Sequence, residues 1–98
     1  MIIMIELEKG NFYKEGNTVY LIGANVPCIG NVFVCKVTKK GKLKNISYLY
    51  KYQYQTHFTL CNPIVIDIKY KSTLQKLFCS DFFEAEKRNK LPNIDRFL

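Results

Sequence analysis

The strongest structural signal of the chain is at residues 31–54, which read NVFVCKVTKKGKLKNISYLYKYQY. Its first part, 31–38, is rich in β-branched and aromatic residues and predicts a strand. The Lys-Lys-Gly-Lys sequence at 39–42 is typical of a turn, and 43–54 predicts a returning strand. The middle of the chain is therefore expected to form an antiparallel β-hairpin with a lysine-rich tip.

Short strands are also predicted on both sides of this hairpin, separated by Gly, Asn and Pro turn signals. They cover residues 2–7, 18–22 and 64–70, with 56–60 as a continuation of the hairpin strand after a bend. A helix is predicted only in the last third, where Asp81 and Glu84 have the spacing of a capping box and Leu91-Pro92 ends the helical pattern. Residues 72–78 fit a helix or a strand.

These elements predict one domain over residues 1–98, with a mainly β (α+β) fold. Five to six short strands and one C-terminal helix suit a small SH3-like or OB-like barrel or a bent antiparallel sheet, because closure removes exposed strand edges. The tail, 93–98, is expected to dock on the body through Ile94, Phe97 and Leu98. Phe82 and Phe83 are expected to pack the helix on the barrel mouth, and an exposed pair would instead mark a partner contact.

The positive charge of the chain is concentrated in its middle. There are 15 Lys and Arg against 8 Asp and Glu, which gives a net charge of +7. No acidic residue lies between Glu15 and Asp67, and the lysines of this interval are Lys36, Lys39, Lys40, Lys42, Lys44 and Lys51. This one-sided distribution of charge produces a local positive field, which attracts phosphate backbones or acidic protein surfaces. Lysine is a point charge, so it favours unspecific phosphate contact over base reading.

The hairpin also carries a tyrosine ladder. Tyr48, Tyr50, Tyr52 and Tyr54 alternate along the chain, so in a strand their side chains point to one face. Three interpretations stay open. The rings are a stacking platform for single-stranded nucleic acid, a core or partly buried ladder that lines the barrel interior or fills cross-strand pairs, or anchors of a protein interface.

The cysteines and the histidine do not form a recognisable reactive site. Cys28, Cys35, His57 and Cys61 lack the close Cys-x-x-Cys spacing of structural zinc sites, so neither a metal nor another cofactor is expected. Cys79 precedes the predicted helix, where backbone amides would lower its pKa, and His57 could act as its base. No orienting partner or nucleophile motif accompanies this pair, so the chain is expected not to be an enzyme.

The predicted location is the cytoplasm, with free thiols. A membrane-spanning helix needs about 20 consecutive apolar residues, and no such run occurs. The first residues, Met1-Ile-Ile-Met-Ile5, carry no basic group, which argues against a secretory signal.

Three segments carry a resemblance to a known group of proteins. They read GNTVY at 16–20, VFVCKV at 32–37 and LFCSDFFEAE at 77–86. This order resembles small SH3-like β-barrel proteins carried by bacteriophages and mobile elements, over roughly half of the chain, and residues 48–70 depart from it. The resemblance implies a binding or interference role, in the host cytoplasm if the protein is phage-encoded, and it carries over no site residues.

The sequence thus predicts a small, basic, non-enzymatic binding module that contacts nucleic acid, DNA or RNA, or a nucleoprotein. The alternative is an inhibitor of the phage anti-defence type that blocks an acidic surface of a host protein through the same residues. In either case the expected contact residues are Lys36, Lys39, Lys40, Lys42, Lys44, Tyr48, Tyr50, Lys51 and Tyr52.

Overall fold

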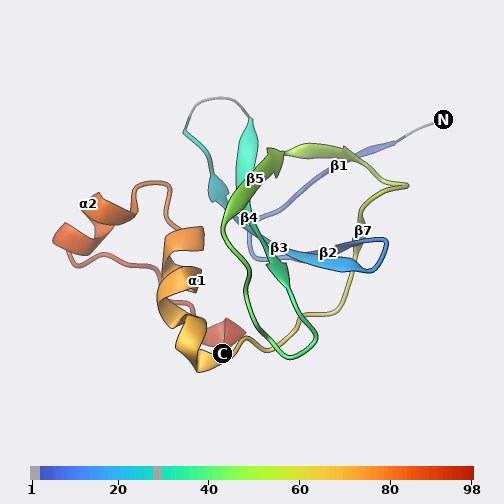
Figure 1. Cartoon of the computed structure of the whole chain (residues 1–98). Coiled ribbons are helices and arrows are strands. Elements are labelled where there is room, and N and C mark those ends of the chain that lie inside the picture. Colours follow the sequence, from blue (N-terminus) through green and yellow to red (C-terminus); the bar gives the residue numbers. More distant parts are fainter. Residues whose placement is uncertain (1–2, 28–29) are drawn as a thin grey trace.

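A computed structural model describes residues 3–27 and 30–98, which form two antiparallel β-sheets with short helices on one side (Figure 1). The larger sheet has the order β5-β4-β3-β2-β7, and the smaller one pairs β1 with β6. The strands are β1 (Met4–Glu6), β2 (Phe12–Glu15), β3 (Thr18–Asn25), β4 (Asn31–Val37), β5 (Ser47–Tyr50), β6 (Tyr52–Tyr54) and β7 (Thr59–Leu60). The helices are α1 (Lys71–Leu77) and α2 (Phe82–Lys87), with 3-10 turns at Ile68–Tyr70 and Asp95–Phe97.

The predicted mainly β, antiparallel fold is confirmed, but the elements differ in number. The described residues form seven strands and two short α-helices, where five to six strands and one helix were predicted. Ile2 of the predicted strand 2–7 lies outside the described residues, as does Cys28.

The larger sheet has a hydrophobic core on each face, because neighbouring residues of a strand point to opposite sides. Along β3, Leu21 belongs to one core and Ile22 to the other. The first core packs the sheet against α1 and the C-terminal tail through Leu74, Leu77 and Phe97. The second core lies under the small sheet. The predicted docking of the tail is confirmed, since Ile94 and Phe97 are buried.

The predicted long strand 43–54 begins at Ser47 and changes sheets at Lys51. The Lys51 N–H donates to the Gly30 carbonyl at 2.8 Å, in line with the β4–β5 pairing. The Lys51 carbonyl accepts from the Leu7 N–H at 2.8 Å, in line with the β1–β6 pairing. One continuous chain segment therefore serves both sheets and bends at Lys51.

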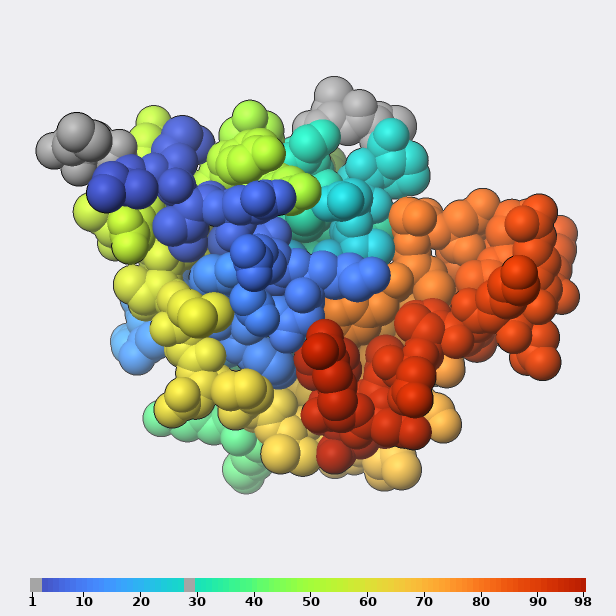
Figure 2. Space-filling model, turned by 180° about the vertical axis from the view of Figure 1, so that it is seen from behind, coloured from blue at the N-terminus to red at the C-terminus, as the bar shows by residue number. Residues whose placement is uncertain are grey.

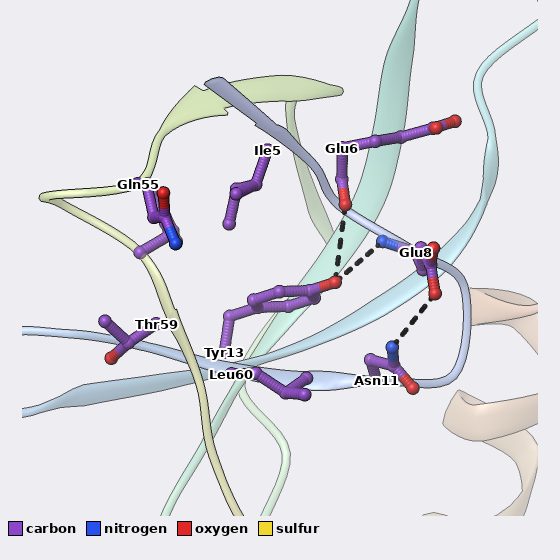
Figure 3. Close-up of a pocket in the computed structure, with 9 residues that line it drawn as sticks. Ile5, Glu6, Glu8, Asn11, Tyr13, Gln55, Thr59 and Leu60 are labelled. Carbon is purple, nitrogen blue, oxygen red and sulfur yellow. Dashed lines mark hydrogen bonds between the residues drawn. The ribbon is translucent and has the colours of Figure 1, made fainter. Parts of the chain in front are cut away.

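The barrel that these sheets suggest is not closed. No strand pairing joins β1 to β2 or β7 in the described residues. At this opening the buried Tyr13 hydroxyl accepts from the Glu8 N–H at 3.1 Å and donates to the Glu6 carbonyl at 3.4 Å (Figure 3). A side chain thus replaces part of a strand ladder, and a hollow of about 470 Å³ remains beside it. The bent sheet describes the molecule, whereas an SH3-like or OB-like closure is not formed.

In the C-terminal half, one predicted strand is wrong and one segment that was left open is a helix. The predicted strand 64–70 is wrong, because the N–H groups of Ile66 and Asp67 donate to the carbonyls of Phe97 and Gly41 at 2.7 and 3.0 Å instead of to a strand. The ambiguous segment 72–78 is a helix, α1. It packs on β3 at Gly23, where an added Cβ would overlap the Leu77 carbonyl.

The predicted capping box begins α2 as expected, since the Asp81 carboxylate accepts from the Glu84 N–H at 3.3 Å. The helix is only six residues long and buries none of them. It projects from the body of the molecule at the end opposite β1 (Figures 1 and 2).

Candidate functional site

The lysine-rich tip is a well-ordered turn that presents its side chains to solvent. The Thr38 N–H donates to the Lys42 carbonyl at 3.0 Å, and the Lys42 N–H donates to Thr38 Oγ1 at 3.1 Å. Gly41 is buried, and its φ of +79° is a conformation that glycine tolerates best. The Gly41 carbonyl accepts a hydrogen bond from the Asp67 N–H at 3.0 Å. With the glycine turned inward, the lysines at 39, 40 and 42 are exposed.

Two further lysines of the hairpin extend this positive region. Lys36 and Lys44 lie on neighbouring chain segments, since the Lys44 N–H donates to the Lys36 carbonyl at 3.0 Å, and both side chains are exposed. A hollow of about 490 Å³ opens beside them. Its lining includes four lysines and no acidic residue.

We call the exposed lysines of this region the basic surface. It consists of Lys14, Lys36, Lys39, Lys40, Lys42 and Lys44. Within the described residues none of these ammonium groups lies within 4.0 Å of a carboxylate, because the ion pairs found there involve Lys51, Lys87 and Arg88. Lys14 was missed by the sequence reasoning, since only the β2–β3 pairing brings it to the hollow. The hairpin therefore carries positive charge that is not paired within 4.0 Å in the described residues.

Lys51 does not contribute to that charge. Its ammonium group lies 2.7 Å from the Glu6 carboxylate of β1. The hydrogen bond to Glu6 raises the pKa of Lys51. Lys51 thus ties the two sheets together at the bend instead of facing a ligand alone.

The tyrosine ladder is exposed, so its interpretation as a buried core ladder is wrong. The four side chains are between 43 and 63% exposed. The rings of Tyr50 and Tyr52 lie 5.8 Å apart across the bend, which joins the ladder into one surface. This exposure suits both remaining interpretations, the stacking platform and the protein interface.

The structure does not merge the lysines and the tyrosines into one patch. The lysine turn lies at one end of the β4–β5 hairpin, and the bend with Tyr50 and Tyr52 lies at the other end (Figure 1). Lys36, Lys44 and Ser47 line a shallow hollow that connects the turn to the start of β5. The predicted contact residues therefore form two neighbouring surfaces.

A third surface lies at the phenylalanine pair of α2, where exposure was the alternative to packing. Phe83 is 75% exposed, so the expected packing of the phenylalanine pair on a barrel mouth is wrong for this residue. Phe82 and Phe83 line an aromatic hollow of about 360 Å³ with Phe33 and Ile46. Lys76 stands at this hollow, with its Nζ 5.5 Å from the Phe82 ring centre.

None of the three described thiols, Cys35, Cys61 and Cys79, has a lowered pKa. Burial raises the pKa of Cys35 to about 11. Burial also raises the pKa of Cys79, and nearby Lys9 offsets this only in part, so the expected lowering by helix amides is wrong. Cys79 borders the aromatic hollow, whereas the His57 ring lies 5.9 Å from that of Tyr54 beyond the bend. No hydrogen bond joins Cys79 to His57.

Residues 3–27 and 30–98 lack both a metal-binding cluster and a membrane-spanning helix. They contain no group of three or more His, Cys, Asp or Glu side chains that could hold a metal ion. No helix among them is long and apolar enough to cross a membrane. Comparisons of the whole chain with protein-family models, curated proteins and solved structures found no match.

Proposed function

We propose that the protein is a nucleic-acid-binding module whose basic surface holds the phosphate backbone. The observation that carries this proposal is the group of exposed lysines around a hollow that no carboxylate lines. Uncompensated ammonium groups in a row attract a polyanion, and binding is driven by the release of its counterions. Lysine contacts carry little sequence information, so we expect weak sequence preference.

The first test is fluorescence anisotropy with labelled single-stranded DNA, duplex DNA and RNA of equal length, between about 50 and 200 mM salt. We expect binding that weakens steeply with salt. The hairpin variant, Lys39→Gln/Lys40→Gln/Lys42→Gln, should bind more weakly and show a log–log salt slope shallower by about 3. A preference for single strands would extend the site to the tyrosines, because bases stack on exposed rings.

The matched control is the helix variant, Lys87→Gln/Arg88→Gln/Lys90→Gln. It loses the same charge from exposed positions on and after α2, away from the basic surface. It should keep most of the affinity. Absence of binding at the lowest salt, or equal losses in both variants, would refute the proposal.

A second candidate function is inhibition of a protein that presents an acidic groove, and the exposure of the tyrosines on the surface next to the basic surface favours it. Under this alternative the hairpin variant would lose one specific protein complex while no phosphate polymer binds. The same two variants therefore separate the two functions.

A further inference from the structure

The strand that bends at Lys51 leaves one of its backbone edges open. Hydrogen-bonded and non-hydrogen-bonded residues alternate along an antiparallel strand. Lys51 donates to Gly30, so the backbone groups of Leu49 and Ser47 face β4. Those of Tyr48 and Tyr50 then face away from the sheet, where β5 is the terminal strand.

The same alternation continues across the bend. Gln55 donates to the Ile3 carbonyl at 2.9 Å, and Leu7 donates to Lys51, so the odd-numbered residues face β1. The backbone groups of Tyr52 therefore face the same way as those of Tyr48 and Tyr50. We call residues 47–52 on this side the open edge. Of its outward groups, the Tyr50 carbonyl is occupied, because it accepts from the Gln53 side-chain amide at 2.7 Å.

The open edge lacks three features that commonly prevent strand pairing. Natural edges are protected by proline, by bulges or by free lysines. The β4–β5 register runs without a break from Val34↔Ser47 to Asn31↔Tyr50, and no proline occurs in 47–54. The one lysine of this segment, Lys51, is held by Glu6.

The surroundings of the edge specify the chemistry of a partner. Tyr48 is cross-strand from Phe33, which lines the aromatic hollow, so an apolar side chain beside β5 could enter that hollow. Lys44 and Lys76 flank this region with no carboxylate within ion-pair distance in the described residues. Asp81 also lines the hollow, but its carboxylate caps α2.

We propose that the open edge accepts an extended segment of a partner protein as an added strand, and that this segment alternates acidic with apolar residues. Main-chain hydrogen bonds to Tyr48, to the N–H of Tyr50 and to Tyr52 provide the pairing, while side chains entering the aromatic hollow and reaching the lysines provide selectivity. A second copy of this chain fits less well, because it would bring the same lysines against each other. The proposal does not rest on nucleic-acid binding.

The test uses a fluorescein-labelled peptide, Glu-Val-Glu-Phe-Glu-Val-Glu, titrated with the intact protein. Two peptides with alternate backbone amides methylated, in the odd or the even set, probe strand pairing directly. Only one set faces β5, so one methylated peptide should lose binding and the other should keep it. Hepta-glutamate should bind much more weakly, since it has no apolar side chains.

Protein variants locate the site. Tyr48→Glu changes an exposed residue next to the hollow, and it should weaken peptide binding by about tenfold through repulsion. Its control, Tyr54→Glu, alters another exposed ring, which lies beyond the open edge, and should have less effect. The hairpin variant should keep peptide affinity within about threefold, because distant charges are screened.

Several results would overturn the proposal: no peptide binding, equal binding of both methylated peptides, equal binding of hepta-glutamate, or loss of binding only in the hairpin variant. Self-association in sedimentation that Tyr48→Glu abolishes would assign the edge to a second copy instead. None of these results bears on nucleic-acid binding, which the anisotropy experiment tests separately.

Discussion

The hydroxyl of Tyr13 bridges β1 and β2 where the sheets fail to join. It is buried and makes two hydrogen bonds to the backbone of Glu6 and Glu8. Tyr13→Phe keeps the ring but leaves the Glu8 N–H without this acceptor, so we expect a loss of about 1–2 kcal/mol of unfolding free energy. Urea denaturation measures it, with Tyr48→Phe as the control whose hydroxyl lies on an exposed side chain. Equal stability of both variants would contradict the bridging role.

Titration of the buried Cys35 thiol should lower the free energy of unfolding at alkaline pH. Its buried thiol donates to the Lys44 carbonyl at 3.5 Å, and burial raises its pKa from 9.0 to about 11. The folded state therefore holds this proton more tightly than the unfolded state. We therefore expect this group to leave the free energy of unfolding unchanged below pH 9 and to lower it between pH 9 and 11, by on the order of 3 kcal/mol.

Urea denaturation of the wild-type protein and of Cys35→Ala at pH 8 and about pH 10.5 isolates this contribution. Cys35→Ala should be less stable at pH 8 because of the cavity. It should lose less stability than the wild type on going to the higher pH. Parallel losses would show that other groups cause the alkaline destabilisation.

At the scale of elements, α1 depends on a glycine of β3. An added Cβ at Gly23 would overlap the backbone and side chain of Leu77, so Gly23→Ala should displace α1 and cost more than about 3 kcal/mol. Gly16→Ala is the control, because Gly16 has open space around it and a φ of +60°. It should cost about 1 kcal/mol of backbone strain, measured by the same denaturation. A small effect at Gly23 would mean that α1 packs less closely than the structure shows.

The second helix should unfold separately from the core. α2 buries no residue, so its cap at Asp81 is a large part of its stability. Asp81→Ala should cost the helix about 1 kcal/mol and speed hydrogen exchange of the Glu84 to Arg88 amides. Exchange in β3 should stay unchanged, and faster exchange there would show that α2 supports the whole fold.

The sequence predicted those elements whose determinants are local. The hairpin turn at 39–42 and the Asp81 cap follow from neighbouring residues and are confirmed. β2 was missed because Phe12 and Tyr13 enter opposite cores, which leaves no simple alternation in four residues. The strand predicted at 64–70 was wrong because its N–H groups meet a turn and the tail, both distant in sequence.

In the candidate site, too, features with local determinants could be predicted and features with long-range determinants could not. The exposure of the lysines could be predicted from their turn. The separation of lysines from tyrosines could not, because it depends on where the strand changes sheets. That position is set by hydrogen bonds of Lys51 to Gly30 and Leu7, which the local pattern of 43–54 does not reveal.

At the scale of the molecule, the positive charge opposes folding. The net charge is +7, and the basic surface gathers six lysines that form no ion pair within 4.0 Å in the described residues. Mutual repulsion of exposed charges is screened as the Debye length falls from about 30 Å at 0.01 M salt to about 10 Å at 0.1 M. Sodium chloride should therefore stabilise the protein, by about 1 kcal/mol over this range, which corresponds to a rise in Tm of about 4–8 °C.

The two triple variants identify the source of this effect. The hairpin variant removes repulsion, so it should have a higher Tm at low salt and a smaller rise with salt. The helix variant removes charges that pair with Glu84, at 4.0 Å for Lys87 and 3.8 Å for Arg88, so it should gain less from the same loss of net charge. Thermal denaturation across the salt series compares them. Identical salt dependence in both variants would show that net charge alone matters and that the basic surface is not a local concentration of repulsion.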